Sequence, residues 1–246
     1  MKERYHLLDG IRGLAVVGMV LFHFSYDMFM ICGLDTGWYW RPEIRLWQIL
    51  GCCTFILLSG LCWHLGRKRV KNGLILNGFG LLVTAVTVIA MPSQAVWFGV
   101  LNCLGCCLLL ATLFEPVLRK IPWQAGGILC FLVFLLTYHV DQGFIGIGQF
   151  VLARLPESWY TVSWLAPLGF PSPDFSSSDY FPLIPWFFLY LTGYFLGRVV
   201  LEKRPKALYR KIPGMDWIGR HSLIIYVCHQ PVCFAVAMGL ARLAGS

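Results

Sequence analysis

The chain has 246 residues, 58% of them hydrophobic and only 13% charged, and its mean hydropathy is +0.68. Because an ordinary soluble domain carries about 25% charged residues, this composition excludes a soluble protein and indicates one that crosses a membrane several times. The net charge of +8 would suit a nucleic-acid partner, but the basic residues gather at one end of the apolar segments, which argues against that class and predicts no nucleic acid.

Seven apolar segments are long enough to cross a bilayer, which takes about 20 residues. They cover residues 11–32, 45–65, 73–91, 95–114, 125–140, 182–201 and 220–240. We therefore expect an all-α polytopic membrane protein, with about seven helices in one bundle and a single domain over residues 1–246. If the N-terminus is cytoplasmic, the only lysines and arginines on the outer side are Arg41, Arg45, Arg154 and Arg242. The positive-inside rule therefore predicts a cytoplasmic N-terminus.

The first apolar segment carries a stripe of ionisable residues. Arg12 lies at its start and His23 follows eleven residues later, a step of three helical turns plus about 20°, which places both side chains on one face about 16 Å apart. Asp9 and Asp27 fall on the same stripe. Ionisable groups inside a bilayer cost roughly 2.5–3.5 kcal/mol each on insertion scales, so the stripe predicts a functional site that faces protein or water.

His23 has the chemistry of a general base, because a neutral imidazole near mid-bilayer accepts a proton from a hydroxyl or an amine. Asp27, one turn further out, would orient the imidazole or stabilise its charged form. The alternative is a purely structural hydrogen bond between the two side chains. In the last segment His229 is expected near mid-membrane, where it either faces a ligand or bonds a backbone carbonyl that Pro231 leaves without its helical partner.

Several cations lie at the cytoplasmic ends of the segments. They include Arg67, Lys68, Arg69, Arg198 and Arg220. They are either an orientation signal or, in addition, a site for a polyanionic cytosolic ligand. The chain also has 10 cysteines, and one pair, Cys103 and Cys106, has CxxC spacing. Since no second pair or histidine accompanies it at ligand spacing, we expect no metal site.

The predicted outer loop, residues 141–181, is the least membrane-like stretch. Its four prolines and its run of serines exclude one regular helix. Its aromatic side chains either rest at the lipid headgroups or line a vestibule for a sugar. They are Trp159, Tyr160, Trp164, Phe170, Phe175 and Tyr180. A loop of this length is often functional, and Asp174 and Asp179 would supply acceptors for hydroxyls or an amine.

Six runs of residues carry a resemblance. They are LDGIRG (8–13), MVLFHF (19–24), FGVLN (98–102), DYFPLIPW (179–186), GRHSLIIY (219–226) and HQP (229–231). Together and in this order they resemble the catalytic-domain family of heparan-α-glucosaminide N-acetyltransferases over nearly the whole chain. The spacing of Arg12 and His23 is also similar to the first helix of the wider membrane-bound acyltransferase-3 group.

The resemblance implies an enzyme that moves an acyl group, usually acetyl, from cytosolic acetyl-CoA to an amine or hydroxyl of a sugar or glycoconjugate across the membrane. His23 and Asp27 would be catalytic, with His23 acting as general base or carrying the acyl group transiently. Acetyl-CoA would bind Arg12, Arg67, Lys68, Arg69, Asn102, Arg198 and Arg220. The acceptor would meet Asp179, Tyr180, Trp186 and His229. Further expected partners are the lipid bilayer and a second copy of the chain in a homodimer, and the expected location is a bacterial plasma (inner) membrane.

Two other function classes remain open at this point. A proton-coupled small-molecule transporter or flippase would use His23, Asp27 and His229 as a proton relay, although we find no inverted repeat of the kind common in transporters. A structural or assembly subunit would explain the apolar surface but not the polar stripe. The acceptor is also open, because lysosomal members of the family carry asparagine where His23 stands, so heparan sulfate itself is not implied.

Overall fold

A computed structural model describes residues 4–243 of the chain. In this range seven helical segments are long and apolar enough to cross a membrane, which confirms the predicted all-α polytopic fold. They are His6–Ile31, Pro42–Leu65, Arg69–Ala90, Val100–Leu118, Trp123–Gln142, Leu183–Lys203 and Ser222–Leu243. The last of them begins two residues later than predicted, because Arg220 ends a separate short helix.

The chain divides into two compact units. Unit 1 comprises Met1–Phe55 and Arg204–Ser246, and unit 2 comprises Ile56–Lys203. The boundary falls within helix α2 (Pro42–Leu61). Each unit is described by itself.

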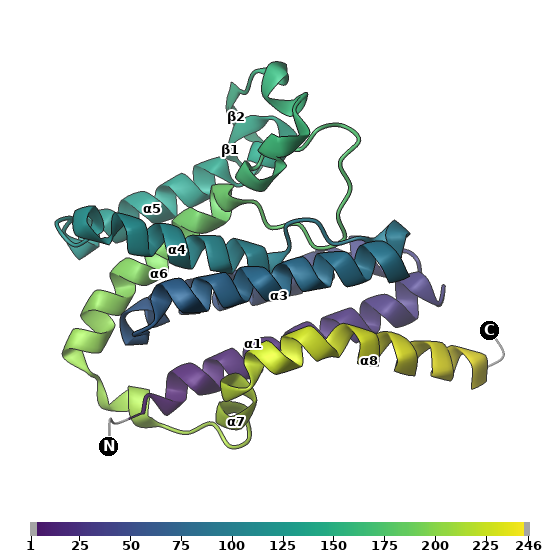
Figure 1. Ribbon diagram of the computed structural model, residues 1–246, viewed down its shortest axis with the longest axis horizontal. Helices are drawn as coiled ribbons and strands as arrows, with labels where there is room; N and C mark the ends of the chain where they lie inside the picture. Colours follow the sequence, from purple (N-terminus) through teal and green to yellow (C-terminus); the bar gives the residue numbers. More distant parts are fainter. Residues whose placement is uncertain (1–3, 244–246) are drawn as a thin grey trace. The chain divides into compact units, whose positions relative to one another are not determined.

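Unit 1 is organised around the first and last helices of the chain. Its elements are α1 (His6–Tyr26), the π-helical turn η1 (Asp27–Ile31), the 3₁₀ turn η2 (Trp38–Trp40), the start of α2, the 3₁₀ turn η8 (Lys206–Tyr209), α7 (Met215–Arg220) and α8 (Ser222–Leu243). Figure 1 shows α1 and α8 running side by side, with α7 packed against the first half of α1.

Two glycines let α1 and α7 touch backbone to backbone. A Cβ atom at Gly13 would lie 2.0 Å from the carbonyl oxygen of Met215, and one at Gly219 would lie 1.8 Å from that of Asp9. Since real side chains never approach a backbone oxygen so closely, only glycine fits at these two positions. The contact fixes the short helix α7 against the start of α1.

Unit 2 consists of packed helix pairs and the loop between α5 and α6. Its helices are α3 (Arg69–Ala90), α4 (Val100–Leu118), α5 (Trp123–Thr137) and α6 (Leu183–Lys203), with the end of α2 and its 3₁₀ continuation η3 (Cys62–Leu65). The main pairs are α3 with α4 and α5 with α6 (Figure 1). Helix α6 supplies the largest of the fully buried side chains in the described residues, Tyr194 and Phe195, each 1% exposed.

Helix α6 also makes a close glycine-mediated contact with the end of α2. A Cβ atom at Gly60 would lie 1.9 Å from the carbonyl oxygen of Tyr190, and one at Gly193 would lie 2.0 Å from that of Leu57. Small residues of this kind allow two membrane helices to approach closely and pack well.

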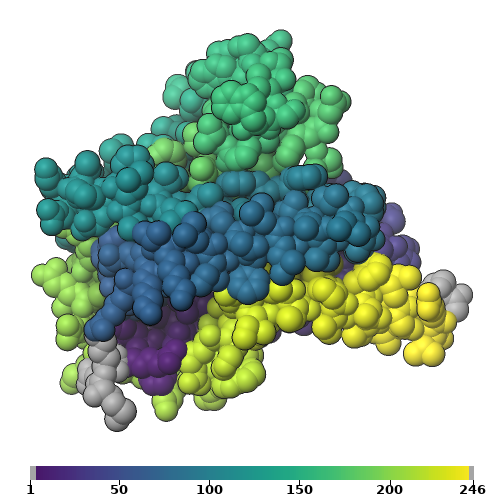
Figure 2. All heavy atoms as spheres, in the orientation of Figure 1, coloured from purple at the N-terminus to yellow at the C-terminus, as the bar shows by residue number. Residues whose placement is uncertain are grey.

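The loop between α5 and α6 has regular structure of its own. A 3₁₀ turn η5 (Val140–Gln142) leads into an antiparallel hairpin of β1 (Phe144–Ile147) and β2 (Phe150–Arg154), followed by the 3₁₀ turns η6 (Glu157–Tyr160) and η7 (Ser163–Leu168). The hairpin turns at Gly148, whose φ of +58° favours glycine. The prediction that this loop is not one helix is confirmed. In Figure 2 the loop forms the green protrusion of unit 2.

Candidate functional site

His23 and His229 meet in unit 1, one from α1 and one from α8. The centroids of their rings are 4.9 Å apart. The two helices are also joined at Val20, whose carbonyl oxygen lies 3.8 Å from the thiol of Cys233. His229 is buried, whereas His23 is partly exposed. The contact brings together two imidazoles that lie 206 positions apart in the sequence.

The hydrogen bond of His229 defines its chemical state when the ring is neutral. Its Nδ1 lies 2.5 Å from the carbonyl oxygen of Tyr226 and therefore carries the proton that it donates. The Nε2 atom is then the basic nitrogen of the ring. The sequence had left open whether this histidine bonds a backbone carbonyl, and it does, but the carbonyl belongs to Tyr226 and not to Val227, four residues before Pro231.

Asp27 does not orient His23 as predicted. The carboxylate is completely buried and accepts two hydrogen bonds from Nε2 of Gln230, at 3.0 and 3.3 Å. The reason is that α8 lies alongside α1 and presents an amide donor at this level, and a buried carboxylate needs such a donor. Among residues 4–243 the ring nitrogens of His23 make no hydrogen bond, and Oε1 of Gln230 is buried without a partner.

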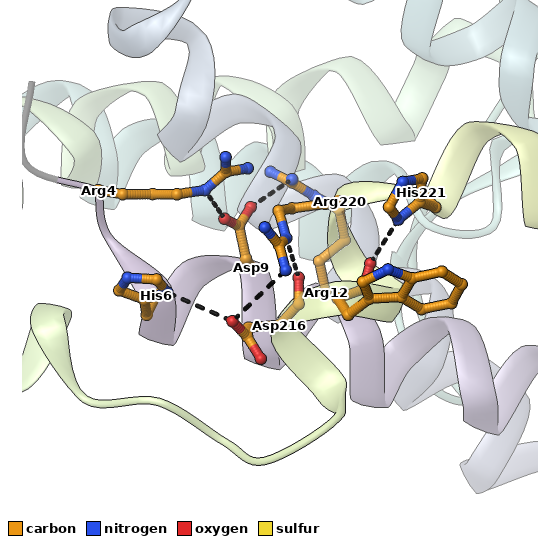
Figure 3. A network of polar contacts seen from close by, with 8 residues as sticks. Arg4, His6, Asp9, Arg12, Asp216, Arg220 and His221 are labelled. Atoms are coloured by element: carbon orange, nitrogen blue, oxygen red, sulfur yellow. Dashed lines mark hydrogen bonds and ion pairs between the residues drawn. The ribbon is translucent and has the colours of Figure 1, made fainter. Parts of the chain in front are cut away.

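A network of charged side chains lies at the start of α1, which we call the N-terminal ion network. Asp9 accepts from Nε of Arg4 at 2.7 Å and from Nη1 of Arg12 at 3.2 Å. On α7, Asp216 lies 3.3 Å from Nδ1 of His6 and 3.9 Å from Nη2 of Arg220 (Figure 3). Three guanidinium groups face two carboxylates, so the network retains a positive charge at this end of α1.

The structure thus holds Arg12 and Arg220, two of the predicted cofactor-binding residues, in one network within unit 1 (Figure 3). Their side chains are 23% and 36% exposed, so both remain accessible to a ligand. Asp216 was missed by the sequence analysis, although its position four residues before Arg220 is a recognisable signal for a helical ion pair.

The other predicted cofactor-binding cations lie in unit 2 and differ in their surroundings. The guanidinium of Arg69 stacks 3.5 Å above the ring centroid of Trp63, and its Nε donates to the carbonyl of the same residue at 3.2 Å. Arg198 donates to the carbonyl of Ile121 at 2.7 Å. Arg67 and Lys68 are exposed. These contacts give Arg69 and Arg198 partners within the protein and leave Arg67 and Lys68 most open to solvent.

Arg69→Ala is expected to lower the stability of the folded protein by about 1–2 kcal/mol, because it removes both the cation–π contact and the hydrogen bond. Arg67→Ala, two residues away, is the matched control and is expected to leave the stability unchanged. The melting temperatures of the detergent-purified variants, compared with wild type, check this. Equal melting temperatures for the two variants would show that the stacked arrangement contributes nothing.

Asn102 is enclosed between α3 and α4. Its Nδ2 lies 3.4 Å from Oδ1 of Asn77, which also accepts from the thiol of Cys106 at 3.4 Å. A Cβ atom at Gly80 would lie 2.4 Å from the Asn102 amide oxygen, so the glycine makes room for this side chain. Asn102 therefore joins α3 to α4. The sequence analysis had predicted it as a residue that binds the cofactor.

The predicted acceptor-side residues of unit 2 have three different environments. Asp179 accepts from the backbone N–H of Val100 at the start of α4, at 3.3 Å. Trp186 is 8% exposed and packs against Phe134 and Phe181. Tyr180 donates to the carbonyl of Ala166 at 2.5 Å and lines a pocket.

That pocket has a volume of about 390 Å³ and lies in the loop between α5 and α6. Its lining combines one carboxylate, two aromatic rings, serine hydroxyls and prolines. The residues are Asp141, Pro171, Ser172, Pro173, Phe175, Ser176, Ser177 and Tyr180. Burial, with the nearby charge of Asp141, raises the pKa of Tyr180, so its phenol stays protonated at neutral pH. This volume is within the range of small-molecule sites.

Comparison with protein families gives one match, which spans residues 4–231 and is described as "Heparan-alpha-glucosaminide N-acetyltransferase, catalytic". The chain belongs to this family. The match begins at Arg4 and ends at Pro231, so it includes both the N-terminal ion network and the histidine pair. Comparison with curated proteins and with solved structures gave no match.

Membership in this acetyltransferase family, together with the seven apolar helices, indicates a multi-pass membrane acetyltransferase. Arg12 and His23, the cation and the imidazole singled out in the sequence, both lie on α1 in unit 1.

Proposed function

We propose that this protein takes an acetyl group from cytosolic acetyl-CoA and transfers it to an amine or hydroxyl of a sugar or glycoconjugate on the other side of a bacterial plasma membrane. The observation that carries the proposal is the layout of α1. Its start carries the N-terminal ion network, and about 16 Å further along the same helix His23 lies against His229. Family membership supports acetyl transfer as the reaction.

The donor is proposed to bind with its phosphates at the N-terminal ion network. Arg12 and Arg220 have guanidinium groups suited to bidentate phosphate contacts, and Asp9 and Asp216 restrict their orientation. The thioester arm would then follow α1 towards His23.

The histidine pair is proposed to move the proton of the reaction. The acceptor nitrogen or oxygen attacks the thioester carbonyl carbon and loses its proton to His23. The carbon–sulfur bond then breaks, and the departing coenzyme A thiolate takes the same proton from His23, which returns the imidazole to its neutral form. His229, fixed by the Tyr226 carbonyl, supports the His23 ring from the side. An acetyl-His23 intermediate fits the same geometry and would add a second transfer step.

The 390 Å³ pocket of unit 2 is proposed, by itself, as a recognition site for a sugar. Asp141 would attract an amine or accept from hydroxyls, and the rings of Phe175 and Tyr180 would pack against the apolar face of a sugar. Asp179 caps α4 and Trp186 packs in the interior, so their proposed part is to support the segment that carries Tyr180.

Acetyl-CoA is expected to raise the melting temperature of the detergent-purified protein in a saturable way. A ligand that binds only the folded state stabilises it by about 2.7 kcal/mol at 100 times its Kd. Free coenzyme A is expected to act similarly, and dephospho-coenzyme A more weakly, because it lacks one phosphate for the arginines.

Transfer of radiolabelled acetyl groups to a panel of amino sugars and glycolipids then identifies the acceptor. No stabilisation by millimolar acetyl-CoA, in protein shown to be folded, would overturn the proposal. Such a result would favour the proton-coupled transporter, for which His23, His229 and Asp27 would form the relay.

A further inference from the structure

The loop between α5 and α6 exposes large apolar side chains outside the membrane-spanning segments. Phe150 is 85% exposed, Leu152 74% and Trp164 73%. Other aromatic side chains of the same loop are packed: the rings of Phe175 and Tyr180, for example, lie 4.9 Å apart. The structure therefore separates the apolar side chains of the loop into a group that lines the pocket and a group that is largely exposed.

The exposed group continues directly from a surface that already faces lipid. The spanning segment that contains α5 ends at Gln142, and β1 begins two residues later. On α5 itself Ile128 and Leu129 are 63% and 62% exposed, as expected for a helix surrounded by acyl chains.

The backbone of the hairpin restricts how deep it can lie. A sheet of only two strands leaves the outer edge of each strand without a neighbouring strand. Unpaired backbone groups cost several kcal/mol each in the hydrocarbon core, so the hairpin cannot be immersed there. In bulk water, in contrast, each Å² of apolar surface that Phe150, Leu152 and Trp164 leave hydrated forgoes about 25 cal/mol of stabilisation.

The headgroup layer satisfies both requirements, since it offers water to the backbone and apolar surroundings to the side chains. Tryptophan is enriched in this layer, and an arginine such as Arg154 at the end of β2 can extend its charge towards the phosphates. We propose that Phe150, Leu152 and Trp164 form a lipid-contacting surface that holds the loop in the interfacial layer at the outer end of α5.

The photoreactive amino acid p-benzoyl-phenylalanine, introduced at position 150, tests this surface. The variant is reconstituted into phosphatidylcholine vesicles and irradiated, and the mass of the intact protein is measured by mass spectrometry. We expect an added mass of one lipid, as at the positive-control position Leu129 on α5. Asp174, an exposed residue of the same loop outside the proposed surface, is the negative control and is expected to give several times less lipid adduct.

Two results would overturn the proposal. One is a position 150 that captures no more lipid than position 174 while position 129 captures lipid. The other is an adduct with a second copy of the chain, which would make the surface a protein interface. Because the readout is lipid contact, it does not depend on acetyl transfer.

A second measurement applies if the variant at position 150 does not fold. Lipids brominated near their ester groups quench the fluorescence of tryptophans at that depth. Trp164→Phe is expected to reduce the quenched part of the total emission. An unchanged quenched part would contradict the proposal.

Discussion

His23→Ala is expected to slow acetyl transfer severely and to leave the protein folded. A positioned general base contributes about 10²–10⁴-fold to a rate, so kcat should fall by this range. His23 is partly exposed and its side-chain nitrogens make no hydrogen bond in the described residues, so its removal should change the melting temperature little. The rate is measured with saturating acetyl-CoA and the acceptor found in the panel.

His221→Ala is the matched control for this experiment. Within residues 4–243 its Nδ1 donates to the carbonyl of Trp217 on α7, at 2.9 Å, and its ring packs against that of Trp217 and not against the histidine pair. We expect near wild-type transfer. His229→Ala should lower kcat as well, because it removes the ring that supports His23. Wild-type transfer by the His23→Ala protein would reduce the pair to a packing contact between α1 and α8.

Gly60→Ala is expected to destabilise the protein strongly. The added methyl group would lie 1.9 Å from the carbonyl oxygen of Tyr190 and 2.9 Å from its carbonyl carbon, both of which are backbone atoms that cannot rotate away. Helices α2 and α6 would have to separate along their contact. Overpacking of this kind costs about 1–3 kcal/mol and occasionally more. The melting temperature in detergent and the yield of monodisperse protein measure the loss.

Gly51→Ala lies on the same helix and differs only in its surroundings, because no atom lies within 4 Å of a Cβ at that position. Alanine is favoured over glycine in a helix by roughly 0.5–1 kcal/mol, so this control should melt at or above the wild-type temperature. A similar decrease for both variants would mean that helix propensity or lipid contact, and not the α2–α6 contact, governs the effect.

The spans could be predicted from the sequence because hydropathy and length are local properties. The start of the last span could not be placed correctly, since the short break at His221 depends on the contact between Gly219 and the start of α1. The hairpin 144–154 was also missed. Its turn carries Gly148 and Gln149, but the surrounding prolines and serines suggested only irregular structure.

The candidate site was predictable to the extent that one helix carries it. The step from Arg12 to His23 fixes a common face of α1 whatever the neighbours are. The partners of buried polar groups come from other helices, so the bonds of Asp27 to Gln230 and of Asn102 to Asn77 required the tertiary structure. Polar residues within apolar spans indicate that a partner exists, but not which helix supplies it.

The π-helical turn after α1 has a consequence for how the chain tolerates changes in length. The amide of Cys32 bonds the carbonyl of Asp27 at 2.9 Å, a five-residue step that completes a single wide turn and leaves both residues facing α8. Loss of one residue inside 28–31 would leave a four-residue step, which in a regular helix is 40° past a full turn and keeps the same face. Loss of one residue between Gly13 and His23 would instead rotate the later part of the stripe, His23 and Asp27, by 100° relative to Arg12. The wide turn is therefore a place where a residue can be gained or lost without changing the alignment of the ion network with the histidine pair.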